Sequence, residues 1–243
     1  MHPWLVANGF TVVKNFLPRR ELRLLKHLAD TSYATVDNGG APDAIKDQVH
    51  AWGGLGLNLL SGLGCVQRDV DKVMAAVQKR AAHYVGPCRV VEDISLLRRH
   101  KESRTLIPWH IDADGAGTAS YDPCVNVWLP LTSVGTIAPS LEVIGGSHTV
   151  MRSEPPLLAS NAGRDQDWIE QTFPAPRRIV AAMDPGDALM FDHFTMHRSQ
   201  AMTSIAARIS GEFRVTTLGV PPHRAGFAGR WAALRDVLRA PTR

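Results

Sequence analysis

Three side chains of metal-binding type stand in two short stretches of the sequence. His110 and Asp112 are one residue apart in Pro108–Asp112, and His197 ends the stretch Gly186–His197. Because side chains alternate between the faces of a strand, a strand here would direct His110 and Asp112 to the same side. Two imidazoles and one carboxylate on one face of an ion, with the other positions open, form the facial triad of non-haem Fe(II) oxygenases. We therefore predict that His110, Asp112 and His197 bind Fe(II).

The spacing of the first two residues is not rare by itself. With 10 His and 23 Asp or Glu among 243 residues, composition alone predicts roughly one His-x-acid motif. His100-Lys-Glu102 is such a motif. It lies in the basic run Arg98–Lys101, which we expect to face solvent at the end of a strand. The downstream pattern is therefore needed to support the choice of His110 and Asp112.

A second histidine, His193, competes with His197 for the third ligand position. Residues 188–191 form the apolar run of a buried strand, and residues 192–195 are typical of the turn that follows. This pattern places His193 on the turn and His197 near the start of the next strand. We therefore assign the third ligand to His197.

An arginine eleven residues beyond His197 suggests that a carboxylate binds close to the predicted metal ligands. Arg208, Ser210 and Glu212 alternate along residues 207–217, so they share one face of a predicted strand. A guanidinium in a pocket binds a carboxylate through two parallel hydrogen bonds. The distal carboxylate of 2-oxoglutarate fits that role, so we expect Arg208 to anchor this cosubstrate, with Ser210 and Ser199 as hydroxyl partners.

The order and spacing of these motifs resemble the phytanoyl-CoA dioxygenase-like family of Fe(II)/2-oxoglutarate oxygenases over about residues 88–217. The resemblance implies a double-stranded β-helix fold, with Fe(II), 2-oxoglutarate and O2 as cofactors and cosubstrates, a small-molecule substrate, and release of succinate and CO2. It also implies that Trp128 lines the cosubstrate pocket, and we assign Asn126, on the same strand face, to that pocket. From the sequence alone, Trp128 is better explained as an aromatic that fills the barrel. The matching segments are Trp-His-x-Asp at 109–112, Val-Trp-Leu-Pro-Leu at 127–131, Leu-Glu-Val-Ile-Gly-Gly-Ser-His at 141–148, Gly-Asp-Ala-Leu-Met-Phe at 186–191, and His-Arg-Ser at 197–199 with Arg208.

Two departures from the family pattern lie outside the predicted ligands. Gly145 stands where the family turn usually has Pro, and residues 133–140 replace the acidic-Asn-Gly segment that commonly precedes that turn. His148, at the end of the turn, is a third imidazole that a facial triad does not need, so we predict a structural role for it. In halogenating relatives the carboxylate position is Gly or Ala, so Asp112 predicts oxygenation or desaturation of the substrate.

The hydrophobic pattern predicts a mainly β protein: a double-stranded β-helix, cupin-like jelly roll with flanking helices. We expect one domain over 1–243, comprising an N-terminal buttress and loop at 1–87, a barrel core at about 88–218 and a closing helix at 224–238. Glycine-rich residues 31–64 are a candidate lid over the active site. The expected strands cover 9–17, 88–97, 123–131, 141–144, 168–173, 178–183, 188–191, 195–202 and 207–218, and the expected helices cover 18–29 and 68–84.

Composition restricts the classes of protein to consider. A net charge of +4 with scattered basic residues argues against a nucleic-acid groove, and no apolar run suggests a membrane span. Three widely separated cysteines, Cys65, Cys88 and Cys124, do not suggest disulfides, and no secretory signal is visible, so we expect a cytoplasmic protein.

Two other classes of protein remain open at this stage. A zinc-dependent hydrolase also uses two His and one carboxylate, although it would give Arg208 no role. A jelly-roll binding module without catalysis is the other alternative. The substrate itself is not encoded in any recognisable motif, although Arg98, Arg99 and Lys101 could attract an anion, and loops 31–64 and 149–167 are the candidate substrate contacts.

Overall fold

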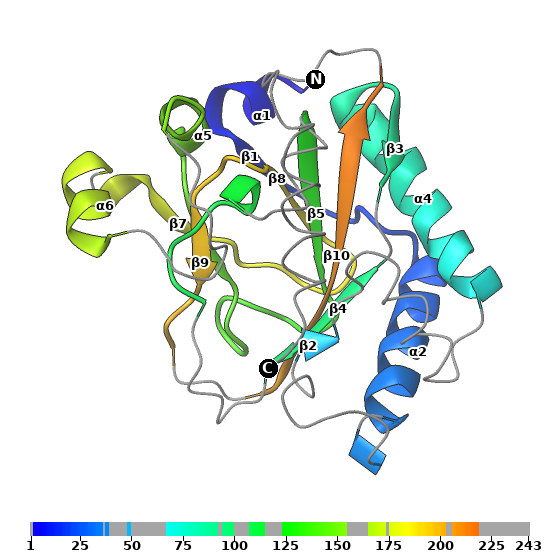
Figure 1. Ribbon diagram of the computed structural model, residues 1–243. Coiled ribbons are helices and arrows are strands. Elements are labelled where there is room, and N and C mark those ends of the chain that lie inside the picture. The colour runs from blue at the N-terminus through cyan, green and yellow to red at the C-terminus, as the bar shows by residue number, and fades with distance from the viewer. Residues whose placement is uncertain are drawn as a thin grey trace, which may run out of the picture.

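The computed structural model describes residues 2–35, 37–38, 48–49, 67–91, 94–99, 107–114, 123–154, 165–173, 175–202 and 206–218. Two antiparallel sheets form its centre (Figure 1), and all named strand pairs are antiparallel. The large sheet has the order β1 (Phe10–Val13), β8 (Ala188–Asp192), β5 (Cys124–Pro130), β10 (Arg208–Thr217), β4 (Ser95–Arg99) and β2 (Gln48–Val49), with β3 (Cys88–Val90) also paired to β10. The small sheet has the order β7 (Arg178–Val180), β6 (Leu141–Ile144) and β9 (His197–Ser199).

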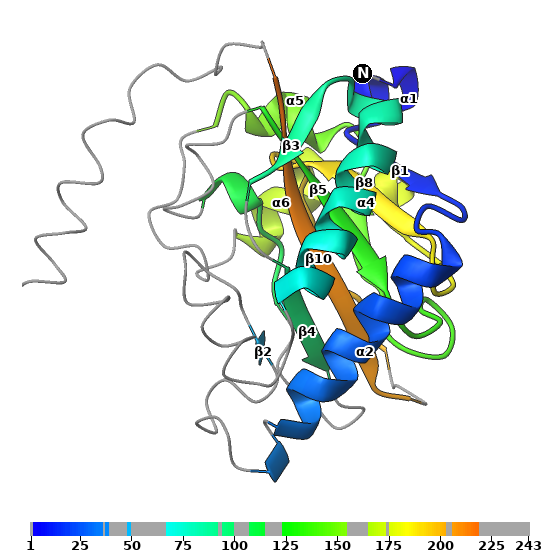
Figure 2. The same ribbon diagram turned by 90° about the vertical axis from the view of Figure 1, so that its right-hand side faces the viewer.

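Two long helices cover the outer face of the large sheet, as Figure 2 shows for α2 (Arg19–Thr35) and α4 (Gln67–Val85). Both helices are amphipathic, and their buried stripes join one hydrophobic core with the outward-facing side chains of β5 and β10. Gly211 of β10 permits the close approach of α2, because a Cβ at this position would lie 3.3 Å from Leu25. Shorter helices in the described part of the chain are α1 (Pro3–Asn8), α5 (Ser147–Met151) and α6 (Gln166–Thr172).

Successive side chains of β10 point alternately into this core and into the interior of the barrel. Phe213 is paired with Val127 of β5 and faces the helices. The next positions along the strand face the other way, where Arg214 is paired with Asn126 and Glu212 with Trp128. Because directly paired residues share one face of a sheet, the inner face of β5 and β10 is polar.

The predicted fold class is confirmed: the molecule is a mainly β, double-sheet jelly roll with flanking helices. No helix among the residues described above combines the length and the apolar composition that a membrane crossing requires. Most of the predicted lid at 31–64 and all of the predicted helix at 224–238 lie outside the described residues. Residues 31–35 of the predicted lid belong to α2.

Several predicted strands differ from those observed, and the one expected at 178–183 is limited to β7. Residues 168–173, expected to form a strand, lie mostly in α6, because the Asp165 carboxylate caps this helix by accepting from the backbone amides of Asp167 and Trp168. The strand expected at 9–17 is limited to β1, since Asn15 has a positive φ of 51°. The segment 88–97 is divided into β3 and β4, and the strand expected at 195–202 is only β9.

His148 has the structural role that the sequence predicted. Its Nε2 lies 3.0 Å from the carbonyl oxygen of Val6, so it ties α5 to α1. Gly9, which ends α1 with a φ of 76°, makes room for this ring, because a Cβ there would lie 2.4 Å from its Nδ1. Nothing larger than glycine fits between the two elements.

Candidate metal centre and cosubstrate pocket

The backbones of His110 and His197 meet in an isolated antiparallel bridge between the segment 107–111 and β9. The amide nitrogen of each residue donates to the carbonyl oxygen of the other, at 3.0 Å in both directions. Paired residues point their side chains to the same face, and the two ring centroids are 4.2 Å apart. The pairing of two distant segments therefore places both imidazoles on one wall.

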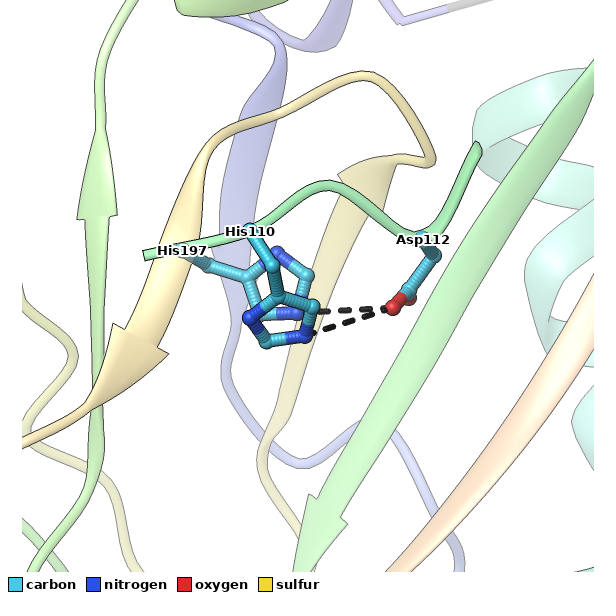
Figure 3. Close-up of side chains that lie close together, drawn as sticks. All are labelled: His110, Asp112 and His197. Carbon is cyan, nitrogen blue, oxygen red and sulfur yellow. Dashed lines mark ion pairs between the residues drawn. The ribbon is translucent and has the colours of Figure 1, made fainter. Parts of the chain in front are cut away.

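Asp112 reaches the same wall in a different way from the one predicted. The segment around it is not a regular strand, because Asp112 begins the short 3-10 turn Asp112–Asp114. Its Oδ1 nevertheless lies 3.6 Å from Nε2 of His110 and 3.7 Å from Nε2 of His197 (Figure 3). One ligand atom from each of the three residues fits within 4.8 Å of the others, and no other such group of His, Cys, Asp and Glu occurs in the described part of the chain.

The rival histidine, His193, is not part of this group. It lies in the turn between β8 and β9, as predicted, and its ring packs edge-on against Phe194 at a centroid distance of 4.4 Å. Its backbone supports the site, because its carbonyl oxygen accepts from the amide of Ala113, next to Asp112. The geometry therefore favours His197 as the third ligand.

Backbone carbonyls fix the tautomer of both imidazoles. Nδ1 of His110 lies 2.8 Å from the carbonyl oxygen of Pro108, and Nδ1 of His197 lies 2.9 Å from that of Thr195. A carbonyl oxygen only accepts, so Nδ1 carries a proton in each ring and Nε2 is the nitrogen that faces Asp112. Partners of this kind orient metal-binding histidines in proteins generally. Each ring can therefore bind an ion through Nε2 once that nitrogen carries no proton.

The charges in the site also suit a divalent cation. Burial, together with the charge of His110, lowers the pKa of His197 to about 4, so this imidazole is neutral at neutral pH. Burial opposes ionisation of Asp112, but the nearby His197, His110 and Arg214 outweigh it and hold the pKa of the carboxyl well below its usual range. A neutral imidazole and an ionised carboxylate are the forms that bind metal.

Arg208 lies in the same interior as a buried cation. It is 3% exposed, and it forms no ion pair with any described residue, although the charge of Glu212 acts on it. Its only described hydrogen bonds run from Nη1 to the carbonyl oxygens of Pro139 and Ser140, at 3.5 and 3.4 Å. Its Nε and the hydroxyl of Ser210 are buried and lack hydrogen-bond partners in the described structure.

Burial makes the positive charge of Arg208 costly. Burial, reinforced by the charge of Arg99, lowers the pKa of Arg208 to about 10, so the guanidinium is still charged at neutral pH. A buried charge without a counter-ion is costly, and a bound carboxylate would remove that cost. The pocket therefore fits the distal carboxylate of 2-oxoglutarate.

Arg99 lies beside Arg208, contrary to the expectation from the sequence. The basic run Arg98–Lys101 was expected to face solvent, but Arg98 and Arg99 are only 9% and 8% exposed. The reason is that β4 is paired on both sides, with β2 and with β10, and so is not an edge strand. Arg99 is directly paired with Arg208, which puts two guanidinium groups on the same face.

Arg98 points to the other face of β4 and is neutralised there. Its two terminal nitrogens lie 2.7 and 2.6 Å from the carboxylate oxygens of Asp37, and its guanidinium covers the ring of Tyr33 at 4.4 Å. Arg99, in contrast, has only a 3.5 Å hydrogen bond to the carbonyl oxygen of Gln200 among the described contacts. Lys101 lies outside the described residues.

Of the other residues predicted to contact 2-oxoglutarate, one lies beside Arg208 and two have other surroundings. The buried ring of Trp128 lies 5.5 Å from the guanidinium carbon of Arg208, so the two are brought together. Ser199 is buried in the small sheet, and no described hydrogen bond joins its hydroxyl to Arg208. Asn126 donates through Nδ2 to Oδ2 of Asp112, so it lies beside the metal ligands.

A jelly roll that places two imidazoles, one carboxylate and a buried arginine in its interior defines a class, the non-haem iron oxygenases that use 2-oxoglutarate. Comparison with protein families makes the assignment specific, because residues 5–210 match the family described as phytanoyl-CoA dioxygenase (PhyH). The chain belongs to this family and is an Fe(II)/2-oxoglutarate-dependent oxygenase. A search of curated proteins finds no match to this sequence.

Solved structures of related enzymes share the fold. The apo form of ThoJ, a non-haem monooxygenase, is 18% identical with a TM-score of 0.64, over 91% of this chain and 78% of the other. EctD from S. alaskensis, solved with 2-oxoglutarate and 5-hydroxyectoine, is 15% identical with a TM-score of 0.58, over 88% and 74%. The epimerase SnoN, solved with Fe3+, α-ketoglutarate and nogalamycin RO, is 18% identical with a TM-score of 0.58, over 92% and 91%.

Proposed function

We propose that His110, Asp112 and His197 hold Fe(II) in this oxygenase, and that the enzyme hydroxylates a small molecule while converting 2-oxoglutarate to succinate and CO2. The observation that carries this proposal is the convergence of both Nε2 atoms on Oδ1 of Asp112, with each Nδ1 held by a backbone carbonyl. Bound Fe(II) supplies the redox chemistry by which O2 oxidises both 2-oxoglutarate and a substrate C–H bond. Activity dependent on added Fe(II), measured as succinate formation, tests it.

The chain's own contribution is binding and orientation. Arg208 receives the distal carboxylate of 2-oxoglutarate, Ser210 contributes a hydroxyl, and Trp128 forms a wall beside the guanidinium. The buried position of these groups excludes water from the reacting centre. Ser199 stays a proposed hydroxyl partner on β9, and Asn126 is now proposed to act on Asp112.

The zinc-hydrolase alternative has less support. It would leave Arg208 and Arg99 as two buried cations with no function, whereas a dicarboxylate cosubstrate explains both. A cytoplasmic location remains part of the proposal, supported by Cys88, which forms no disulfide among the described residues. The proposal also includes a single catalytic domain over the whole chain.

We expect Arg99 to contribute to cosubstrate binding. Arg99→Met should weaken 2-oxoglutarate binding by about ten- to a hundredfold, because a hydrogen bond to a charged group contributes about 1.5–3 kcal/mol and 1.4 kcal/mol is tenfold in affinity. Arg98→Met is the matched control, since Arg98 lies on the opposite face and pairs with Asp37. Equal effects of the two substitutions on 2-oxoglutarate affinity, measured by anaerobic titration, would contradict this role.

The product is expected to gain oxygen or to be desaturated, and to contain no halogen. Asp112 fills the coordination position that halogenating relatives leave open for a halide. Mass spectrometry of the product formed in chloride buffer checks this, once a substrate has been found by screening small molecules for stimulated succinate release. A chlorinated product would show that Asp112 does not occupy that position.

A further inference from the structure

Asn126 is a polar residue in an unexpected place, at the middle of β5 in the centre of the large sheet. It is 0% exposed, and it is paired with Phe191 of β8 on one side and Arg214 of β10 on the other. A buried amide costs stability unless its polar atoms are hydrogen-bonded. Its Nδ2 has a partner, since it donates to Oδ2 of Asp112.

The second polar atom of the amide has none. Oδ1 of Asn126 is buried and lacks a hydrogen-bond partner among the described residues. An amide retained only to stabilise the sheet would be expected to have both its donor and its acceptor satisfied. Because only the donor of this amide is hydrogen-bonded, we attribute the presence of Asn126 at this position to its bond with Asp112.

The two carboxylate oxygens of Asp112 have different neighbours. Oδ1 faces Nε2 of His110 at 3.6 Å and Nε2 of His197 at 3.7 Å, whereas Oδ2 is held by Asn126. The backbone does little to fix this orientation, because Asp112 belongs to a 3-10 turn outside the strand ladders. The orientation of its carboxylate therefore depends on its side-chain contacts.

We infer that Asn126 is a positioning residue that restricts Asp112 to binding the metal through Oδ1 alone. A carboxylate binds a cation through one oxygen or through both. Binding through both would use a coordination position that 2-oxoglutarate or O2 requires. This inference rests on the proposed iron site and explains how that site keeps its remaining positions open.

Substitution of Asn126 tests whether this residue positions the Asp112 carboxylate or only stabilises the sheet. In Asn126→Leu the amide that donates to Oδ2 is lost with little change in side-chain size, so this donor no longer directs Oδ2 away from the ion. Loss of a partner of a metal ligand typically lowers metal affinity or activity by about ten- to a hundredfold. In this variant we expect a loss of that size in the anaerobic binding of 2-oxoglutarate to the Fe(II)-loaded protein, with Fe(II) binding retained because Asp112 still contributes Oδ1. A crystal structure of the Fe(II)-loaded variant should show Asp112 binding through two oxygens.

Val127→Ala is the matched control, because Val127 is adjacent, fully buried and directed to the opposite face. It should lower the melting temperature through a cavity in the core while both affinities stay at the wild-type level. If Asn126→Leu does not fold, Asn126→Ser replaces it, since a serine hydroxyl is too short to reach Oδ2 and the same separation of affinities is expected.

Two results would overturn the inference. One is 2-oxoglutarate affinity at the wild-type level in the variant, and the other is an equal loss of Fe(II) and 2-oxoglutarate affinity, which would make Asn126 a general support of the ligand. Wild-type protein that binds Fe(II) but no 2-oxoglutarate would instead argue against the proposed function. The two failures are therefore distinguishable.

Discussion

Replacement of His197 by alanine should abolish both stoichiometric Fe(II) binding and turnover while the protein remains folded. The reason is that Nε2 of His197 is one of only three ligand atoms on the proposed ion, and its ring lies at the interior wall of the barrel. The backbone bridge to His110 is unaffected by the change, so the segment keeps its position. Metal content by mass spectrometry and succinate formation measure the two losses, and circular dichroism checks the fold.

His193→Ala is the control for this experiment. Its ring is buried and contacts Phe194, so the substitution should reduce thermal stability through loss of packing. It should leave Fe(II) binding intact, since His193 is not part of the ligand group. Loss of iron in His193→Ala together with its retention in His197→Ala would show that the third ligand was assigned to the wrong histidine.

The second large effect is expected at Arg208. Truncating one member of a buried charge pair costs about 2–5 kcal/mol. At 1.4 kcal/mol for each factor of ten, Arg208→Ala should therefore weaken 2-oxoglutarate binding by roughly thirty-fold to several thousandfold. Arg208→Lys should recover only part of the loss, because an ammonium group cannot form the two parallel hydrogen bonds of a guanidinium.

Iron affinity separates this effect from general damage to the site. Arg208 is not a ligand, so Arg208→Ala should bind Fe(II) with nearly wild-type affinity while its 2-oxoglutarate affinity falls. Titration of the anaerobic, Fe(II)-loaded protein with 2-oxoglutarate gives the comparison directly. Unchanged 2-oxoglutarate affinity in Arg208→Ala would remove the main support for the cosubstrate pocket.

The parts of the site that could be predicted from the sequence are those set by side-chain type and order. His110, Asp112 and His197 were predicted together, and the structure brings their ligand atoms within 4.8 Å. The prediction used strand alternation at residues 108–112, but the observed cause is a single backbone bridge followed by a turn. Both the predicted strand and the observed bridge and turn direct His110 and Asp112 to one side. The two residues were therefore grouped correctly although the local structure differs.

Arg99 shows what the sequence could not reveal. Whether a basic residue at the end of a strand faces solvent depends on which strands lie beside it, and β4 has neighbours on both sides. The pairing of Arg99 with Arg208 joins residues more than one hundred positions apart. No local pattern contains this information, although alternation along β4 would have placed Arg98 and Arg99 on opposite faces.

The errors in secondary structure have a similar origin. Residues 168–173 have an apolar content compatible with a strand, but the Asp165 cap and the burial of Ile169 favour α6. The helix α4 was predicted closely and the presence of α2 was predicted, because a long amphipathic stripe carries a stronger signal than a strand of three to five residues. The end of α2 was not, since the helix continues from the expected end at 29 to Thr35.

The most direct test of the iron and cosubstrate sites is an anaerobic crystal structure of the wild-type protein soaked with Fe(II) and 2-oxoglutarate. We predict iron bound by Nε2 of His110, Oδ1 of Asp112 and Nε2 of His197, with the distal carboxylate of 2-oxoglutarate on Arg208. Iron bound by other residues, or 2-oxoglutarate bound away from Arg208, would contradict this assignment.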